Sequence, residues 1–240
     1  MKIGVLDSGV GGLTVLASLI KNVPNHEYIY YGDTVHLPYG EKSREEVIKY
    51  TNNIIKFLED NGVDLIVIAC GSISSNKEYL QSKKEIIDII SPIKGKLDKY
   101  NKISIMATPL SIKTNAFKKY ITSELNLISC PKLVPIIESN NYTNLEEVLK
   151  EYLNSTSDSD ALILGCTHYP IIKDNISKLF HKDIICLDEF VVEIIKDKEE
   201  TKSGLKLYFS KVDSILENKV KRILGINNIC IERKCLNDWK

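Results

Sequence analysis

The chain has 240 residues, of which 43% are hydrophobic and 27% are charged, an ordinary composition for one or two globular domains with their own cores. Its 32 basic residues balance its 32 acidic residues, so no charge excess favours nucleic acid or a membrane surface as a partner. The six cysteines include no Cys-x-x-Cys pair, which argues against a zinc framework or a disulfide scaffold and predicts free thiols.

The first third of the sequence alternates between short apolar strands and amphipathic helices. Strands are expected at residues 2–7, 27–33 and 63–70, and helices at residues 11–23 and 43–62. The second helix has a clear start, because Ser43 can cap it and Glu46 stands at the capping-box position. This alternation predicts a parallel sheet with crossover helices.

A charged segment with proline and glycine, residues 91–102, is typical of a linker. Beyond it we expect strands at residues 103–108, 160–166 and 205–210, and helices at residues 109–125, 144–154 and 212–225. The fold class predicted is therefore α/β, with two similar three-layer lobes, mostly parallel sheets and an active site in the cleft between them. Residues 1–94 and 205–240 would form the first lobe, and residues 95–204 the second.

The sequence shows no targeting or membrane segment. The N-terminus enters a strand pattern at once, without the features of a signal peptide. The longest apolar run, residues 65–70, is far too short to span a bilayer. We therefore expect a cytoplasmic protein whose thiols stay reduced.

Two cysteines occupy corresponding positions in the two halves. Residues 62–72 and 158–168 share a polar lead-in, an apolar strand, a cysteine, and then hydroxyl or imidazole side chains. The pattern indicates an internal duplication that places Cys70 and Cys166 at the carboxyl ends of equivalent strands. Ligands of parallel α/β sheets bind at these ends, so two facing lobes would bring both thiols to one cleft.

These motifs also have simpler structural explanations. The segment DSGVGG (7–12) could cradle an anion, but it serves equally well as a tight strand–helix turn. Cys70 alone would more often be a packing residue, because free cysteines are commonly buried. Cys166 differs, since His168 lies two residues on and can favour a thiolate. Thiols on opposite faces of an amino acid could exchange its α-proton if donors held the developing charge.

Four segments together resemble one known family. They are IGVLDSGVGGLTVL (3–16), YYGDTVHLPYG (30–40), LVPIIE (133–138) and LGCTHYPIIK (164–173). In order and spacing they resemble the glutamate racemases of the aspartate/glutamate racemase superfamily, over nearly the whole chain. The resemblance implies racemisation without cofactor or metal by two cysteines, here Cys70 and Cys166. It also implies a homodimer and a supply of D-glutamate for peptidoglycan.

The resemblance implies roles for further residues. Asp7 would support the first cysteine, and Glu138 and His168 the second, which completes the implied catalytic set. The residues with implied substrate contacts are Asp7, Ser8, Tyr39, Gly40, Gly71, Ser72, Thr167 and His168.

The residues after Cys70 depart from the family's pattern, which usually reads Cys-Asn-Thr-Ala-Ser. This chain reads Cys70-Gly71-Ser72-Ile73-Ser74. Losing an amide that contacts a charged substrate weakens binding by about 1.5–3 kcal/mol unless another group replaces it. Two alternatives therefore stay open. The chain could racemise another amino acid in a pocket altered at Gly71, or it could be a non-catalytic relative that binds an amino acid or a protein partner for regulation.

Overall fold

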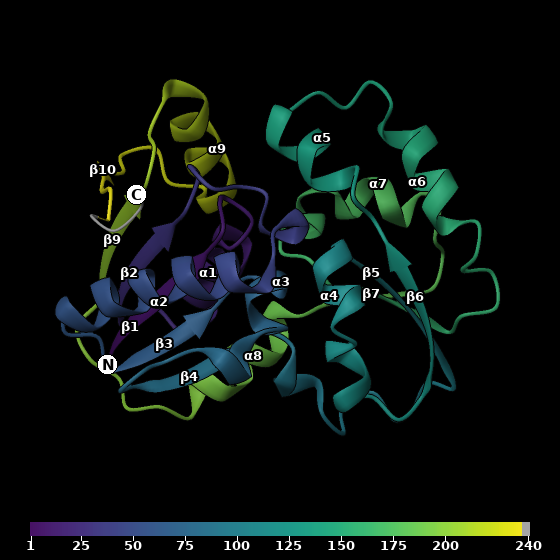
Figure 1. Ribbon diagram of the computed structural model, residues 1–240, viewed down its shortest axis with the longest axis horizontal. Helices are drawn as coiled ribbons and strands as arrows, with labels where there is room; N and C mark the ends of the chain where they lie inside the picture. The colour runs from purple at the N-terminus through teal and green to yellow at the C-terminus, as the bar shows by residue number, and fades with distance from the viewer. Residues whose placement is uncertain (237–240) are drawn as a thin grey trace.

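The computed structural model describes residues 1–236. They form two sheets that lie side by side (Figure 1). The first sheet has the order β10-β9-β2-β1-β3-β4, with β1 (Lys2–Asp7), β2 (Glu27–Gly32), β3 (Leu65–Ile68), β4 (Glu85–Asp88), β9 (Gly204–Phe209) and β10 (Ile231–Arg233). The second has the order β6-β5-β7-β8, with β5 (Lys102–Ala107), β6 (Glu124–Ser129), β7 (Ala161–Leu164) and β8 (Asp183–Cys186). Every strand pairing within residues 1–236 is parallel, which confirms the predicted fold class.

The α-helices are α1 (Leu13–Asn22), α2 (Arg44–Asp60), α3 (Gly71–Ser74), α4 (Pro109–Lys113), α5 (Leu133–Ser139), α6 (Leu145–Leu153), α7 (Lys173–Ser177), α8 (Asp188–Lys196) and α9 (Ser214–Leu224). Short 3-10 turns occupy Tyr39–Glu41, Lys77–Tyr79, Ser91–Ile93, Ala116–Lys119 and Tyr169–Ile172. The predicted capping box of α2 is confirmed. Ser43 Oγ accepts from the Glu46 N–H at 3.2 Å, and Glu46 Oε2 accepts from the Ser43 N–H at 3.0 Å. None of the helices within residues 1–236 is long and apolar enough to cross a membrane.

The two halves repeat one strand order. The order β2-β1-β3-β4 of the first sheet matches β6-β5-β7-β8 of the second. Strand β3 leads to Cys70 and strand β7 leads to Cys166, and all four residues of each strand are buried. Such short, unbroken apolar strands are typical of parallel sheets covered on both faces. The repeat is the arrangement expected of a duplicated unit.

The helix predicted over residues 109–125 is wrong. The structure divides this segment into α4, the 3-10 turn Ala116–Lys119 and the start of β6. Asn115 has a left-handed backbone (φ 52°), which ends the helical path just after α4. Farther along, Leu125 and Leu127 alternate with polar residues and pack against the core as an edge strand. Short apolar runs fit both the helical and the strand period, so their spacing did not separate the two.

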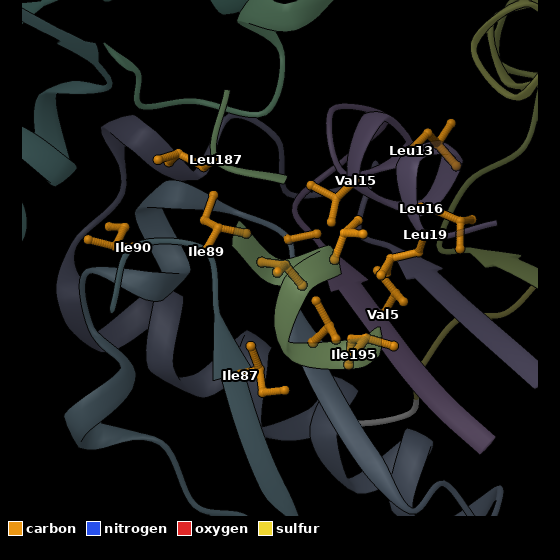
Figure 2. Packing of buried hydrophobic residues seen from close by; sticks show 14 of the residues in the cluster. Val5, Leu13, Val15, Leu16, Leu19, Ile87, Ile89, Ile90, Leu187 and Ile195 are labelled. Carbon is orange, nitrogen blue, oxygen red and sulfur yellow. The ribbon is translucent and has the colours of Figure 1, made fainter. Parts of the chain in front are cut away.

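The chain returns to the first sheet earlier than expected. Helix α8 lies within residues 95–204, the range assigned to the second lobe, but it packs against α1. Its apolar residues Val191 and Ile195 join Val5 and Leu16 in one core cluster, and Figure 2 shows Ile195 beside Val5. Because this face of α8 is apolar, packing it against α1 removes it from water. In the predicted segment 205–240, residues 237–240 lie outside the described part of the chain.

Candidate active site

Residues from both lobes line a small cavity of about 20 Å³. Its walls come from the segments that follow the carboxyl ends of the strands. They are Ser8, Pro38, Tyr39, Gly40, Glu41, Cys70 and Ser72 from the first lobe, and Thr108, Pro109, Cys130, Pro131, Val134, Cys166, Thr167 and His168 from the second. That volume holds about one water molecule, so the walls have to separate before an amino acid fits. A wider groove of about 730 Å³ lies elsewhere, beside Thr14 and Lys173, and neither Cys70 nor Cys166 lines it.

Cys70 stands where β3 gives way to α3 and is 5% exposed. Ser8 Oγ lies 3.4 Å from its Sγ. Burial raises the pKa of the Cys70 thiol to about 12, and the nearby Asp7 adds to this, against hydrogen bonds from Ser8 and the Ile73 N–H. Cys70 is therefore a thiol at neutral pH and can give up a proton to a carbanion beside it.

Cys166 belongs to a line of polar side chains. His168 Nδ1 lies 3.8 Å from Cys166 Sγ, and His168 Nε2 donates to Glu138 Oε1 at 2.6 Å. Burial alone would lower the pKa of His168, but its contacts with Cys166 and Glu138 raise it well above its usual value. Burial likewise opposes the charge on Glu138, yet His168 and Lys219 lower its pKa to about 2. The second thiol therefore faces an imidazolium held by a carboxylate.

Asp7 ends β1 beneath the two thiols and is completely buried. Its Oδ2 accepts from the Gly9 N–H at 2.8 Å, and its Oδ1 accepts from Thr167 Oγ1 at 3.4 Å. Burial raises the pKa of Asp7, while His168 and main-chain N–H groups oppose the shift. The loop after Asp7 has to be thin, because a Cβ on Gly11 would lie 2.4 Å from His168 Nδ1. The motif DSGVGG therefore packs directly against His168 of the second lobe.

Most of the predicted site residues meet at the cavity. Ser8, Tyr39, Gly40, Cys70, Ser72, Cys166, Thr167 and His168 all line it. Asp7 and Glu138 lie behind this wall and reach it through Thr167 and His168.

Gly71 is not among the lining residues. A Cβ at Gly71 would lie 2.5 Å from the carbonyl oxygen of Gly165, so the main chain of the second lobe fills the space. We expected the missing side-chain amide at Gly71 to alter the pocket. The structure instead shows that the two lobes approach each other closely at Gly71, so no empty space remains there.

A hydroxyl network stands beside this contact. Ser72 Oγ lies 2.8 Å from Thr108 Oγ1, which lies 3.0 Å from Ser111 Oγ. Sequence reasoning missed Thr108, although it directly follows strand β5, at the same sheet edge as the cysteines. It also missed Lys219, which contacts Glu138, and nothing in the sequence distinguishes this lysine from the other lysines of the chain. Within residues 1–236, no group of three His, Cys, Asp or Glu side chains is arranged to hold a metal ion.

Comparisons with known proteins extend over almost the entire chain. No protein-family model matches it. Glutamate racemase of Aquifex aeolicus is 34% identical over 241 residues, which cover 94% of each chain. Glutamate racemase of Lactococcus lactis subsp. lactis is 35% identical in an alignment 260 positions long, which covers 99% of this chain and 91% of the relative.

A solved structure agrees with these relatives. The crystal structure of glutamate racemase from Francisella tularensis subsp. tularensis in complex with D-glutamate superposes with a TM-score of 0.88. The superposition has 31% identity and covers 99% of this chain and 98% of the other. Sequence and structure agree over nearly the full length of each chain. This chain therefore belongs to the glutamate racemase family, whose members are isomerases of the aspartate/glutamate racemase superfamily.

Proposed function

We propose that this chain interconverts L- and D-glutamate by moving the α-proton between Cys70 and Cys166. The observation that carries the proposal is the inequality of the two thiols in one cavity. Cys70 is buried beside Ser8, and the pKa of its thiol is raised to about 12, whereas Cys166 faces the His168–Glu138 pair. One site can thus hold a proton donor and a proton acceptor at once, as a two-base racemisation requires.

The proposed reaction conserves protons. Cys166, as a thiolate balanced by the His168 imidazolium, removes the α-proton from one face of the substrate. The electron pair left on Cα spreads into the carboxylate, and the Cys70 thiol donates its proton to the opposite face. Cys166 then carries the proton and Cys70 is the thiolate, so the site is ready for the other enantiomer. No net proton is gained or lost.

The remaining site residues have supporting roles in this proposal. Asp7 orients the first-lobe loop, and Glu138 orients His168. The polar groups of Ser8, Tyr39, Gly40, Ser72 and Thr167 would bind the carboxylates and the ammonium group, since their hydroxyls and N–H groups line the cavity. Gly71 would contribute through its main chain alone, with the Ser72–Thr108 hydroxyl pair beside it in place of the family's amide.

The resemblance supports three wider statements. The product D-glutamate would supply peptidoglycan synthesis. The location would be the cytoplasm, where a reducing environment keeps both thiols free. The assembly would be a homodimer, which light scattering on a size-exclusion column measures directly.

Proton exchange tests the function. Purified protein is incubated in D2O with L- and D-glutamate, aspartate, serine, alanine and glutamine, and loss of the Cα–H signal is followed by NMR. We expect exchange with both glutamate enantiomers in the parent, and no racemisation by polarimetry in Cys70→Ala or Cys166→Ala, because each variant lacks one of the two bases. Cys186→Ala serves as the matched thiol control, because Cys186 is buried but lines the other groove. Exchange with a different amino acid would favour the altered-specificity alternative. No exchange in folded, reduced protein would favour a binding protein.

A further inference from the structure

Helix α9 carries a buried lysine. Lys219 is only 9% exposed and lies on the helix face that also buries Leu216 and Val220. Lysine is almost never buried without a partner, because removing its charge from water is costly. Its Nζ lies 2.9 Å from Glu138 Oε2 and also donates to the main-chain oxygen of Glu138. One residue of the other lobe therefore satisfies this lysine.

Glu138 is shared between Lys219 and the histidine of the site. Its Oε1 accepts from His168 at 2.6 Å, while its Oε2 faces Lys219. His168 in turn lies 3.8 Å from the sulfur of Cys166. The four side chains form one line from α9 to the thiol, and their charges alternate in sign when Cys166 is a thiolate.

The contact between Lys219 and Glu138 joins the two lobes. Helix α9 packs against α1 of the first lobe, whereas α5, which carries Glu138, packs into the core cluster of the second. One turn farther along α9, Arg222 donates to Asn140 Oδ1 at 3.2 Å, at the end of α5. Because both contacts need α9 docked on α5, separating the lobes removes the cation from Glu138.

We infer that Lys219 is a positioning residue that orients Glu138 toward His168 when the lobes close and completes the charge balance of the Cys166 thiolate. The inference rests on the proposed function, since only a reaction that takes a proton onto Cys166 needs this balance. Other titratable groups also face the same line: Asp7 of β1, Tyr30 of β2, Cys70, Cys130 and Tyr169. None of these five supplies a positive charge.

Removing the charge of Lys219 favours proton binding along the line. We expect Lys219→Met to move the midpoints of the kcat/KM–pH profile upward by about one unit and to lower kcat/KM about tenfold near neutral pH. Lys219→Arg keeps the charge and should keep the parent's midpoints. Arg222→Gln is the matched control, because it removes a cation and an inter-lobe contact from the same helix without touching Glu138. Its midpoints should stay in place.

A second readout does not depend on activity. The chain has four histidines, so protein labelled with [15N]histidine gives a simple spectrum in which mutation identifies His168. The Nε2–H proton shared with Glu138 should move downfield in Lys219→Met, because the carboxylate charge then concentrates on His168. It should not move in Lys219→Arg or Arg222→Gln. Lys219→Gln, which can still donate to the main-chain oxygen of Glu138, replaces Lys219→Met if that variant does not fold.

The inference would be overturned if Lys219→Met left both the midpoints of the kcat/KM–pH profile and the chemical shift of the His168 Nε2–H proton unchanged. Equal shifts in Arg222→Gln would overturn it as well, since they would come from the lobe contact in general. Failure of the proposed function is distinguishable. In that case the parent exchanges no α-proton with any amino acid, while the His168 resonance still reports whether Lys219 acts on Glu138.

Discussion

Adding a side chain at Gly71 should force the two lobes apart. A Cβ at this position would lie 2.5 Å from the carbonyl oxygen of Gly165 and 3.6 Å from Ser111 Oγ. The Gly165 oxygen belongs to the main chain directly before Cys166, so it cannot rotate away as a side chain could. An ordinary van der Waals contact, 3.4 Å or longer, requires α3 and the end of β7 to separate by about 0.9 Å or more.

The size of the effect follows from this overlap. Forcing an extra methyl group into a packed site destabilises it by about 1–3 kcal/mol. If the closed lobes are the state that reacts, this lowers kcat/KM by about 5- to 150-fold. We expect Gly71→Ala to fall in that range. Gly71→Asn, which introduces the residue usual in the family, should be no more active than Gly71→Ala, because it adds the same Cβ and more atoms beyond it.

Polarimetry from either pure enantiomer measures kcat/KM, and thermal unfolding shows whether each variant is folded. Gly204→Ala is the control glycine, since its Cβ would meet the flexible Glu27 side chain at 3.1 Å, far from the cavity. It should retain the parent's activity. A Gly71→Asn variant as active as the parent would refute the reasoning, because the close approach to Gly165 would then not belong to the reacting state.

Three further predictions concern the second lobe and the lobe contact. His168→Gln should lower kcat/KM by about 10²–10⁴-fold. The factor should be the same from L- to D-glutamate and from D- to L-glutamate, because the enantiomers have equal free energy. A loss of kcat/KM smaller than tenfold, measured by polarimetry, would contradict this. The folded pKa of Glu138 is about 2, below its ordinary 4.5, so its pairing contributes stability above pH 4.5 that is lost as the pH falls toward 2. We therefore compare the unfolding free energies of the parent and of Glu138→Gln, measured in urea. Their difference should shrink as the pH falls through this window, from an upper limit of about 3 kcal/mol. A difference that stays constant with pH would argue against the pairing. Ser72→Ala removes the 2.8 Å contact with Thr108 and should destabilise the protein by about 1 kcal/mol; an unchanged urea midpoint would mean that the contact adds nothing.

Local patterns predicted the part of the fold that local physics decides. The capping residues of α2 and the buried apolar runs of β3 and β7 are sequence-local, and each appears in the structure as predicted. The equivalence of Cys70 and Cys166 was also visible, because both follow a buried strand. The end of the segment 109–125 was not predictable in this way, because its apolar spacing fits both a helix and a strand, and its last residues form a strand by pairing with β5.

The candidate site was predictable only where it lies at strand ends. Glu138 came from family resemblance alone, since it lies on α5 and not after a strand. Lys219 contacts it across 81 positions of sequence, and its amphipathic helix offers no sign that one lysine is buried. The close approach of Gly71 to Gly165 likewise depends on how the lobes dock, which no short motif encodes.

The pairing of β9 with β2 has a consequence for the protein during synthesis. Glu27 pairs with Gly204, so the ribosome adds about 180 residues after β2 before its partner emerges, which takes about 10–35 s at typical rates. During that time one edge of the tyrosine-rich strand β2 has unpaired main-chain groups, which can pair with other chains. A nascent chain stopped before residue 204 should therefore aggregate instead of accumulating as a separate first lobe.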